Sequence, residues 1–219
     1  MSRLGLELEG IEMAYLLPAD YANYGLPSGT TPDWVTAATA LINSYCRRPD
    51  LNVVQYQERL RVVSGSQTVR LSYLPLVPLG TAASPIVAVE GKYGRVRRGE
   101  VAEAPMLQVA LAFSLPGEWT TIDPGSVDFA ADTGELTLPW SVMGLPYNDV
   151  MVTYTAGLAV IGDDVKSACA QIVRNAQAQP ALSTSMTKID TMQMKYFSSS
   201  LLDDTVKMWL RPYVANRLG

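Results

Sequence analysis

A chain of 219 residues is long enough for one sizeable domain, or for one domain with a large insertion. Hydrophobic residues make up 48% and charged residues 17%, which indicates a globular rather than a disordered chain. Histidine is absent, and this excludes the Ser–His–Asp triad, the Cys–His pair and the HExxH metal site. The net charge of −4 disfavours tight DNA binding, which normally needs a basic face.

The charges are distributed unevenly along the chain. Residues 51–100 hold seven Lys or Arg and three acids, whereas residues 101–150 hold seven acids and no Lys or Arg. This separation predicts two surfaces of opposite sign, which subunits stacked head to tail in a ring would use. Two differently solvated hairpins explain the same pattern equally well.

The two cysteines, Cys46 and Cys169, are far apart in the sequence and lack metal-ligand spacing. We therefore expect two small buried thiols in a reducing compartment, with no metal and no cofactor. No apolar run approaches the length of about 18 residues that a membrane span needs, and the N-terminus has no signal-peptide pattern. These features predict synthesis and assembly in a cytoplasm, with no membrane partner.

The N-terminal part of the chain combines an arm with a first helix. Residues 1–30 form an apolar, irregular arm, which we expect to lie along its own domain or along a neighbouring subunit. Thr31 and Pro32 then predict the start of a helix that Pro49 ends. Its predicted apolar stripe consists of Trp34, Ala38, Leu41 and Tyr45, broadened by Ala37 and Ile42, and Arg47 and Arg48 suit its C-terminal end.

A β-rich region follows at about residues 53–155. Residues 58–63 and 68–73 flank Ser64-Gly65-Ser66-Gln67, which predicts a hairpin, and residues 91–95 are expected to form a turn. The other predicted strands are 86–90, 106–113, 127–129 and 135–138 around an Asp132-Thr133-Gly134 turn, and 149–155.

Two further helices are predicted after the strands. The first is capped by Asp163 and runs to about Ala178, before Pro180, with Val165, Cys169, Ile172 and Ala176 on one face. In the Ser/Thr/Met-rich residues 181–200, Met192, Met194 and Tyr196 alternate as in an exposed strand, and Met186 adds to a surface that orders on assembly. Ser200 is expected to cap the last helix. The predicted fold is therefore α+β, with a small core of three main helices, an inserted antiparallel β region and extended N- and C-terminal arms.

Several segments form a characteristic order along the chain: Trp34…Ala38…Leu41-Ile42…Tyr45, Tyr56-Gln57-Glu58, Leu79…Pro85-Ile86, Trp119-Thr120-Thr121-Ile122-Asp123, Gly134-Glu135-Leu136-Thr137-Leu138, Val152-Thr153-Tyr154-Thr155-Ala156-Gly157, Asp164-Val165-Lys166…Ala168, Leu201-Leu202 and Trp209-Leu210-Arg211-Pro212-Tyr213. Taken in this order, they resemble the head–tail connector (adaptor) family of long-tailed phages and gene transfer agents. The resemblance covers about residues 31–219, a single connector domain with its β insertion and a C-terminal docking segment at about 181–219. The arm at 1–30 and residues 91–147 depart from the compact family pattern.

The resemblance implies a structural protein of the virion neck rather than an enzyme. Such a subunit forms a ring, commonly twelve-fold, that sits between the portal and the stopper or tail-completion protein. DNA passes transiently through the channel of the ring. The alternatives are another neck or tail-completion protein, a ligand- or carbohydrate-binding β domain, and a carboxylate-based hydrolase.

Two groups of residues are candidate sites. The first is the apolar stripe of the predicted C-terminal helix, together with nearby arginines. This stripe either docks on the portal or packs in the core of its own subunit. The second is a group of cations that lines a subunit interface or the DNA channel, or forms a solvated hairpin. The stripe comprises Leu202, Val206, Trp209, Leu210, Arg211, Tyr213 and Arg217, and the cations are Lys92, Arg95, Arg97 and Arg98.

An acid-only stretch is a third feature. Paired carboxylates there would suit a glycosidase or a calcium site, but the spacing matches no EF-hand loop, and Asp123 and Asp132 fall where Asp is a good turn former. Acids facing a channel would also repel DNA and let it slide. The residues are Glu103, Glu118, Asp123, Asp128, Asp132, Glu135 and Asp149.

Overall fold

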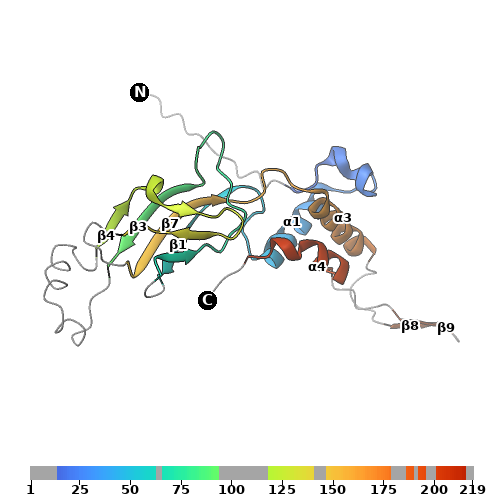
Figure 1. Ribbon diagram of the computed structural model, residues 1–219. Coiled ribbons are helices and arrows are strands. Elements are labelled where there is room, and N and C mark those ends of the chain that lie inside the picture. Colours follow the sequence, from blue (N-terminus) through green and yellow to red (C-terminus); the bar gives the residue numbers. More distant parts are fainter. Residues whose placement is uncertain are drawn as a thin grey trace, which may run out of the picture. The chain divides into compact units, whose positions relative to one another are not determined.

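The computed structural model describes residues 14–62, 66–93, 118–140, 147–178, 186–189, 192–195 and 201–215. The chain divides into two compact units, one helical and one made of strands (Figure 1). The helical unit comprises Met1–Pro49 and Ile161–Val214, and the β unit comprises Asp50–Val160 with Ala215–Gly219. The predicted α+β class is confirmed.

Three α-helices form the helical unit in the described part of the chain: α1 (Pro32–Cys46), α3 (Asp163–Ala178) and α4 (Asp204–Leu210). Two 3-10 helices, η1 (Pro18–Tyr24) and η3 (Arg211–Tyr213), belong to the same unit. Helix α3 packs against α1, α4 and η1, so it is the central element of the unit. A hairpin of β8 (Met186–Ile189) and β9 (Met192–Lys195) lies between α3 and α4 in the chain, which confirms the strand predicted at Met192 and Met194.

The predicted stripe of α1 is correct only in part: Ala38 and Ile42 are buried as predicted, whereas its other four residues are not. Trp34 is 42% exposed and Ala37 is exposed, and Leu41 and Tyr45 are only half-buried. The physical reason is close helix packing, because small side chains let α1 approach α3, where the Cys169 thiol contacts Thr39. The buried residues of α1 are Val35, Ala38, Thr39, Ile42 and Cys46.

The described part of the N-terminal arm packs on its own helical unit. Tyr15 donates its backbone N–H to Thr39 Oγ1 of α1 at 3.4 Å. On the α3 side, Tyr24 donates its hydroxyl to Asp163 at 2.6 Å, and Lys166 lies 3.5 Å from the carboxylate of Asp20. Residues 14–30 are therefore part of the helical unit and not a separate extension.

Within the described residues, the β unit contains two antiparallel sheets. The larger one has the order β1-β7-β3-β4, formed by β1 (Val54–Arg61), β7 (Asp149–Ala156), β3 (Ile86–Lys92) and β4 (Trp119–Ile122) (Figure 1). The smaller one has the order β2-β6-β5, formed by β2 (Thr68–Arg70), β6 (Glu135–Thr137) and β5 (Asp128–Phe129). A single turn of 3-10 helix, η2 (Pro124–Ser126), precedes β5. The strands predicted at 86–90, 127–129, 135–138 and 149–155 are confirmed, whereas the strand predicted at 106–113 lies outside the described residues.

The predicted hairpin of residues 58–63 with 68–73 is wrong. Strand β1 pairs with β7 over eight residues, and β2 pairs instead with β6. The buried face decides this pairing, since Tyr56 lies opposite Tyr154 and Leu60 opposite Val150, and all four contribute to the apolar core. A long strand register with a buried face therefore determines the partner of β1 more strongly than the residues of a local turn do.

The inward faces of both sheets meet in one hydrophobic core. Val89 and Val152 of the larger sheet are fully buried, as is Leu136 of the smaller one, and Val69 is 6% exposed. Because each sheet turns one face to this core, the outer faces of both sheets point away from it.

Candidate functional site

Helix α4, the centre of the predicted docking stripe, begins at Asp204 with Asp203 as its N-cap. The Asp203 carboxylate accepts the backbone N–H of Val206 at 2.7 Å, which satisfies one of the free donors of the first turn. The prediction that Ser200 caps this helix is therefore wrong. Asp caps a helix as well as Ser does. The apolar residues Leu201 and Leu202 favour an earlier start of the helix in the sequence, which is why Ser200 is the predicted cap.

The structure divides the residues of the predicted stripe into two groups. Val206 and Leu210 are fully buried, so they hold α4 in the helical unit. Leu202 and Trp209 are half-buried and Arg211 is exposed, whereas Arg217 lies outside the described residues.

Tyr213 belongs with the anchoring residues. Its hydroxyl donates a short hydrogen bond to the carboxylate of Asp164 on α3. Burial and this hydrogen bond raise the pKa of Tyr213 to about 12. The phenol therefore ties the segment after α4 to α3.

Met208 is a surface residue that sequence reasoning missed. It is 65% exposed, the most exposed large hydrophobic side chain of the helical unit in the described ranges. It lies next to Trp209 and three residues before Arg211 in the chain. Helical spacing could have found it, because a residue two positions after Val206 and two before Leu210 must point away from the face that they bury.

In the β unit, two cations surround an aromatic ring at one end of the larger sheet. Lys92 Nζ lies 5.5 Å from the ring centroid of Trp119, and the guanidinium carbon of Arg59 lies 5.6 Å from the same ring. Arg59 also contacts the Asp149 carboxylate at 3.0 Å. We call these four residues the Trp119 cluster.

Only Lys92 of the four predicted cations, Lys92, Arg95, Arg97 and Arg98, lies within the described residues. Lys92 belongs to strand β3 and not to a turn, which corrects the turn expected at 91–95, and Gly91 is in the same strand. The residues Arg95, Arg97 and Arg98 lie outside the described residues. Sequence reasoning missed Arg59 and Trp119, because only the pairing of β1, β7, β3 and β4 brings them beside Lys92.

The acidic residues are spread over separate turns and strands. The Asp123 side chain accepts the backbone N–H of Gly125 at 3.1 Å, so it caps η2. Asp128 and Glu135 lie on β5 and β6, and Glu103 lies outside the described residues. Among the residues that the structure describes, no three His, Cys, Asp or Glu side chains come close enough to hold a metal ion.

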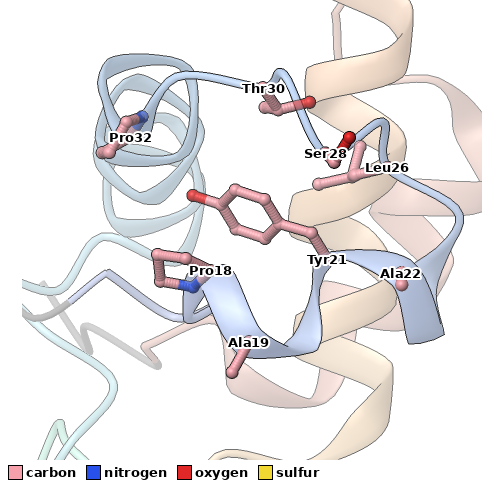
Figure 2. Close-up of a pocket in the computed structure, with 8 residues that line it drawn as sticks. All are labelled: Pro18, Ala19, Tyr21, Ala22, Leu26, Ser28, Thr30 and Pro32. Atoms are coloured by element: carbon pink, nitrogen blue, oxygen red, sulfur yellow. The ribbon is translucent and has the colours of Figure 1, made fainter.

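A pocket of about 250 Å³ lies between the arm and the start of α1 (Figure 2). The Tyr21 ring crosses it, and the buried hydroxyl of Thr30 has no hydrogen-bond partner within the described structure. Burial and the nearby thiol of Cys169 raise the pKa of Tyr21. The lining side chains are uncharged: Pro18, Ala19, Tyr21, Ala22, Leu26, Ser28, Thr30 and Pro32.

Both cysteines have the environment of structural thiols. They are free and fully buried. Burial raises the pKa of Cys46 to about 11 and that of Cys169 to about 12. Both thiols therefore stay protonated and weakly nucleophilic near neutral pH.

Among the described helices, none is both long and apolar enough to cross a bilayer. No protein-family model matches the chain, and no curated protein matches its sequence. A function therefore has to be argued from the residues and their arrangement.

Proposed function

We propose that this chain is a structural subunit of a tailed-phage neck, without catalytic activity. It forms a ring, twelve-fold in the virion, that joins the portal to the stopper or tail-completion protein and extends the channel through which DNA passes. The resemblance of the ordered sequence segments to head–tail connectors supports this role and names the portal as a partner.

The observation that carries the proposal is the form of the C-terminal helix. Val206 and Leu210 fix α4 in the helical unit, while Met208 and Arg211 remain exposed and Trp209 is half-buried. Trp and Arg are the residue types that dominate binding energy in protein interfaces, and an exposed Met adapts to the surface that it meets. A rigidly mounted helix with such side chains at its surface suits docking on a partner. We call Met208, Trp209 and Arg211 the α4 docking surface.

Deleting residues 200–219 does not isolate this role, because it removes Val206 and Leu210 from the core. Point variants at the surface of α4 provide the sharper test. In the full chain, Met208→Ala combined with Arg211→Glu should weaken binding to purified portal rings by about tenfold or more. Binding is measured by biolayer interferometry, and ring attachment by negative-stain microscopy. Arg174→Glu, an exposed charge reversal on α3, is the matched control.

The variants should keep the thermal stability of the wild-type chain, since neither side chain is buried. Unchanged portal binding by the double variant would overturn the assignment of docking to α4. A wild-type chain that neither assembles alone nor binds portal rings would overturn the neck function itself.

A further inference from the structure

The outer face of the larger sheet of the β unit carries a basic row at one end. In the strand register, Arg61 lies opposite Asp149, Asp149 opposite Lys92, and Lys92 opposite Trp119. This row crosses all four strands. It faces away from the core, because Val150, the neighbour of Asp149 in β7, is fully buried and side chains alternate along a strand.

The charges of this face are unequal. Arg59, Arg61 and Lys92 are its cations, and Glu90 and Asp149 are its acids among the described strand residues. Asp149 is engaged by Arg59 at 3.0 Å, and the Arg59 side chain is still 60% exposed. We call Arg59, Arg61, Lys92 and Trp119 the basic face; it combines excess positive charge with a large half-buried aromatic ring.

The outer face of the smaller sheet has the opposite sign. Asp128 and Glu135 are exposed on neighbouring strands, and Asp132 is exposed in the turn that joins them. Arg70, opposite Glu135, is the one cation of these three strands, and its Nε–H donates to the Thr133 carbonyl at 3.1 Å. We call Asp128, Asp132 and Glu135 the acidic face.

The two faces belong to different sheets, and both point away from the one core into which the inward sides of the sheets pack. A unit with complementary charges on two different faces can bind a copy of itself head to tail, and a repeated head-to-tail contact generates a ring when its rotation closes. A two-fold contact, in contrast, would place each face against one of its own sign.

We propose that the basic face of one subunit docks on the acidic face of the next, so that the β units form the contact between neighbours in the ring. This inference rests on the proposed function and specifies the surface that a second copy uses. Trp119 supplies the desolvated centre of the contact, and the surrounding charges set its direction and partner.

The same face is less suited to DNA. Glu90 and Asp149 stand among its cations, and carboxylates at these places repel a phosphate backbone. The complementary acidic face is present in the same chain, which favours a second copy as the occupant.

Charge reversal in the full chain tests this interface. One variant carries Arg59→Glu, Arg61→Glu and Lys92→Glu, so that both of its faces are acidic. The other carries Asp128→Lys, Asp132→Lys and Glu135→Lys, so that both are basic. Each variant alone should self-associate at least about tenfold more weakly than the wild-type chain, and an equimolar mixture of the two should restore assembly.

Self-association is followed by sedimentation velocity and native mass spectrometry, alone and on portal rings, with circular dichroism to check folding. Arg174→Glu is the control for a reversed charge on the helical unit. If folded single-face variants assemble like the wild-type chain, or if the mixture fails to rescue them, the interface is wrong while the ring function stands. Loss of fragment-DNA binding in the first variant, without loss of assembly, also overturns the interface and assigns the face to DNA. A wild-type chain that remains monomeric in every condition overturns the ring function together with the interface.

Discussion

At the residue scale, Gly157 shows how one position fixes the end of a strand. It directly follows β7, and its φ of +143° is one that side-chain-bearing residues rarely adopt. A Cβ added to Gly157 would lie 2.2 Å from the backbone oxygen of Asn52. The backbone N–H of Gly157 donates to the Pro75 carbonyl at 3.0 Å. The Tyr154-Thr155-Ala156-Gly157 segment is one of those on which the family resemblance depends. The close approach of the Asn52 backbone is the physical reason for its glycine.

Substituting Gly157 with alanine should therefore be severe. We expect Gly157→Ala to lower the free energy of unfolding by about 3 kcal/mol or more, because both the backbone conformation and the contact with Asn52 must change. Urea unfolding measured by fluorescence checks the value. Gly29→Ala is the matched control, since a Cβ at Gly29 meets nothing within 4 Å and should change stability by less than about 1 kcal/mol. Equal effects at the two positions would contradict this account.

At the scale of elements, the N-termini of α1 and α4 differ in how they are capped, and the sequence does not predict this difference. Thr31 and Asp203 both occupy N-cap positions with extended backbone. Only Asp203 uses its side chain, which accepts the Val206 N–H, whereas Thr31 forms no side-chain cap hydrogen bond. Thr and Asp are both favoured N-cap residue types, so residue type does not distinguish the two positions.

The difference gives a paired prediction. Asp203→Ala should lower the free energy of unfolding by about 1 kcal/mol, the usual value of a bonded N-cap. Thr31→Ala should lower it by clearly less, because no cap bond is lost. Thermal melting followed at 222 nm compares the two variants, and a larger loss in Thr31→Ala would show that the assignment of the caps is wrong.

The sequence predicts strands correctly where the deciding residues are neighbours in the chain, and fails where the partner strand is distant. The turn at Asp132-Thr133-Gly134 is local, and the sequence predicted its two flanking strands correctly. The partner of β1 is β7, far along the chain, and nothing in residues 58–73 indicates it. For the same reason Lys92 was identified as a candidate while Arg59 and Trp119 were not, since a cluster across four strands is visible only once the sheet order is known.

At the scale of the whole molecule, buried thiol and phenol groups make the free energy of unfolding depend on pH in the alkaline range. Burial is the main cause that raises the pKa of Cys46 to about 11, and of Cys169 and Tyr213 to about 12. Their ordinary values are 9.0 for cysteine and 10.0 for tyrosine. Between the ordinary and raised values the folded chain holds more protons than the unfolded chain, so stability falls as pH rises.

We therefore expect the free energy of unfolding to be constant up to about pH 9 and to fall between pH 9 and 11. Each buried thiol contributes up to about 1.4 kcal/mol per pH unit in that window. Urea titrations at pH 8, 9.5 and 10.5 measure the slope, and Cys169→Ala should reduce it even though that variant starts from a lower stability. A slope that is flat or rises with pH would contradict the burial of these groups.

The helical unit is assembled from two segments that Asp50–Val160 of the β unit separates in the chain. Helix α1 leaves the ribosome long before α3, the helix against which it packs. The β unit is nearly continuous in sequence, so all of its strands have been synthesised before α3. The α4 docking surface then takes shape only when α3 and α4 have been made. For the proposed neck subunit, this order means that a nascent chain cannot present the docking surface to a portal before its β unit has been synthesised.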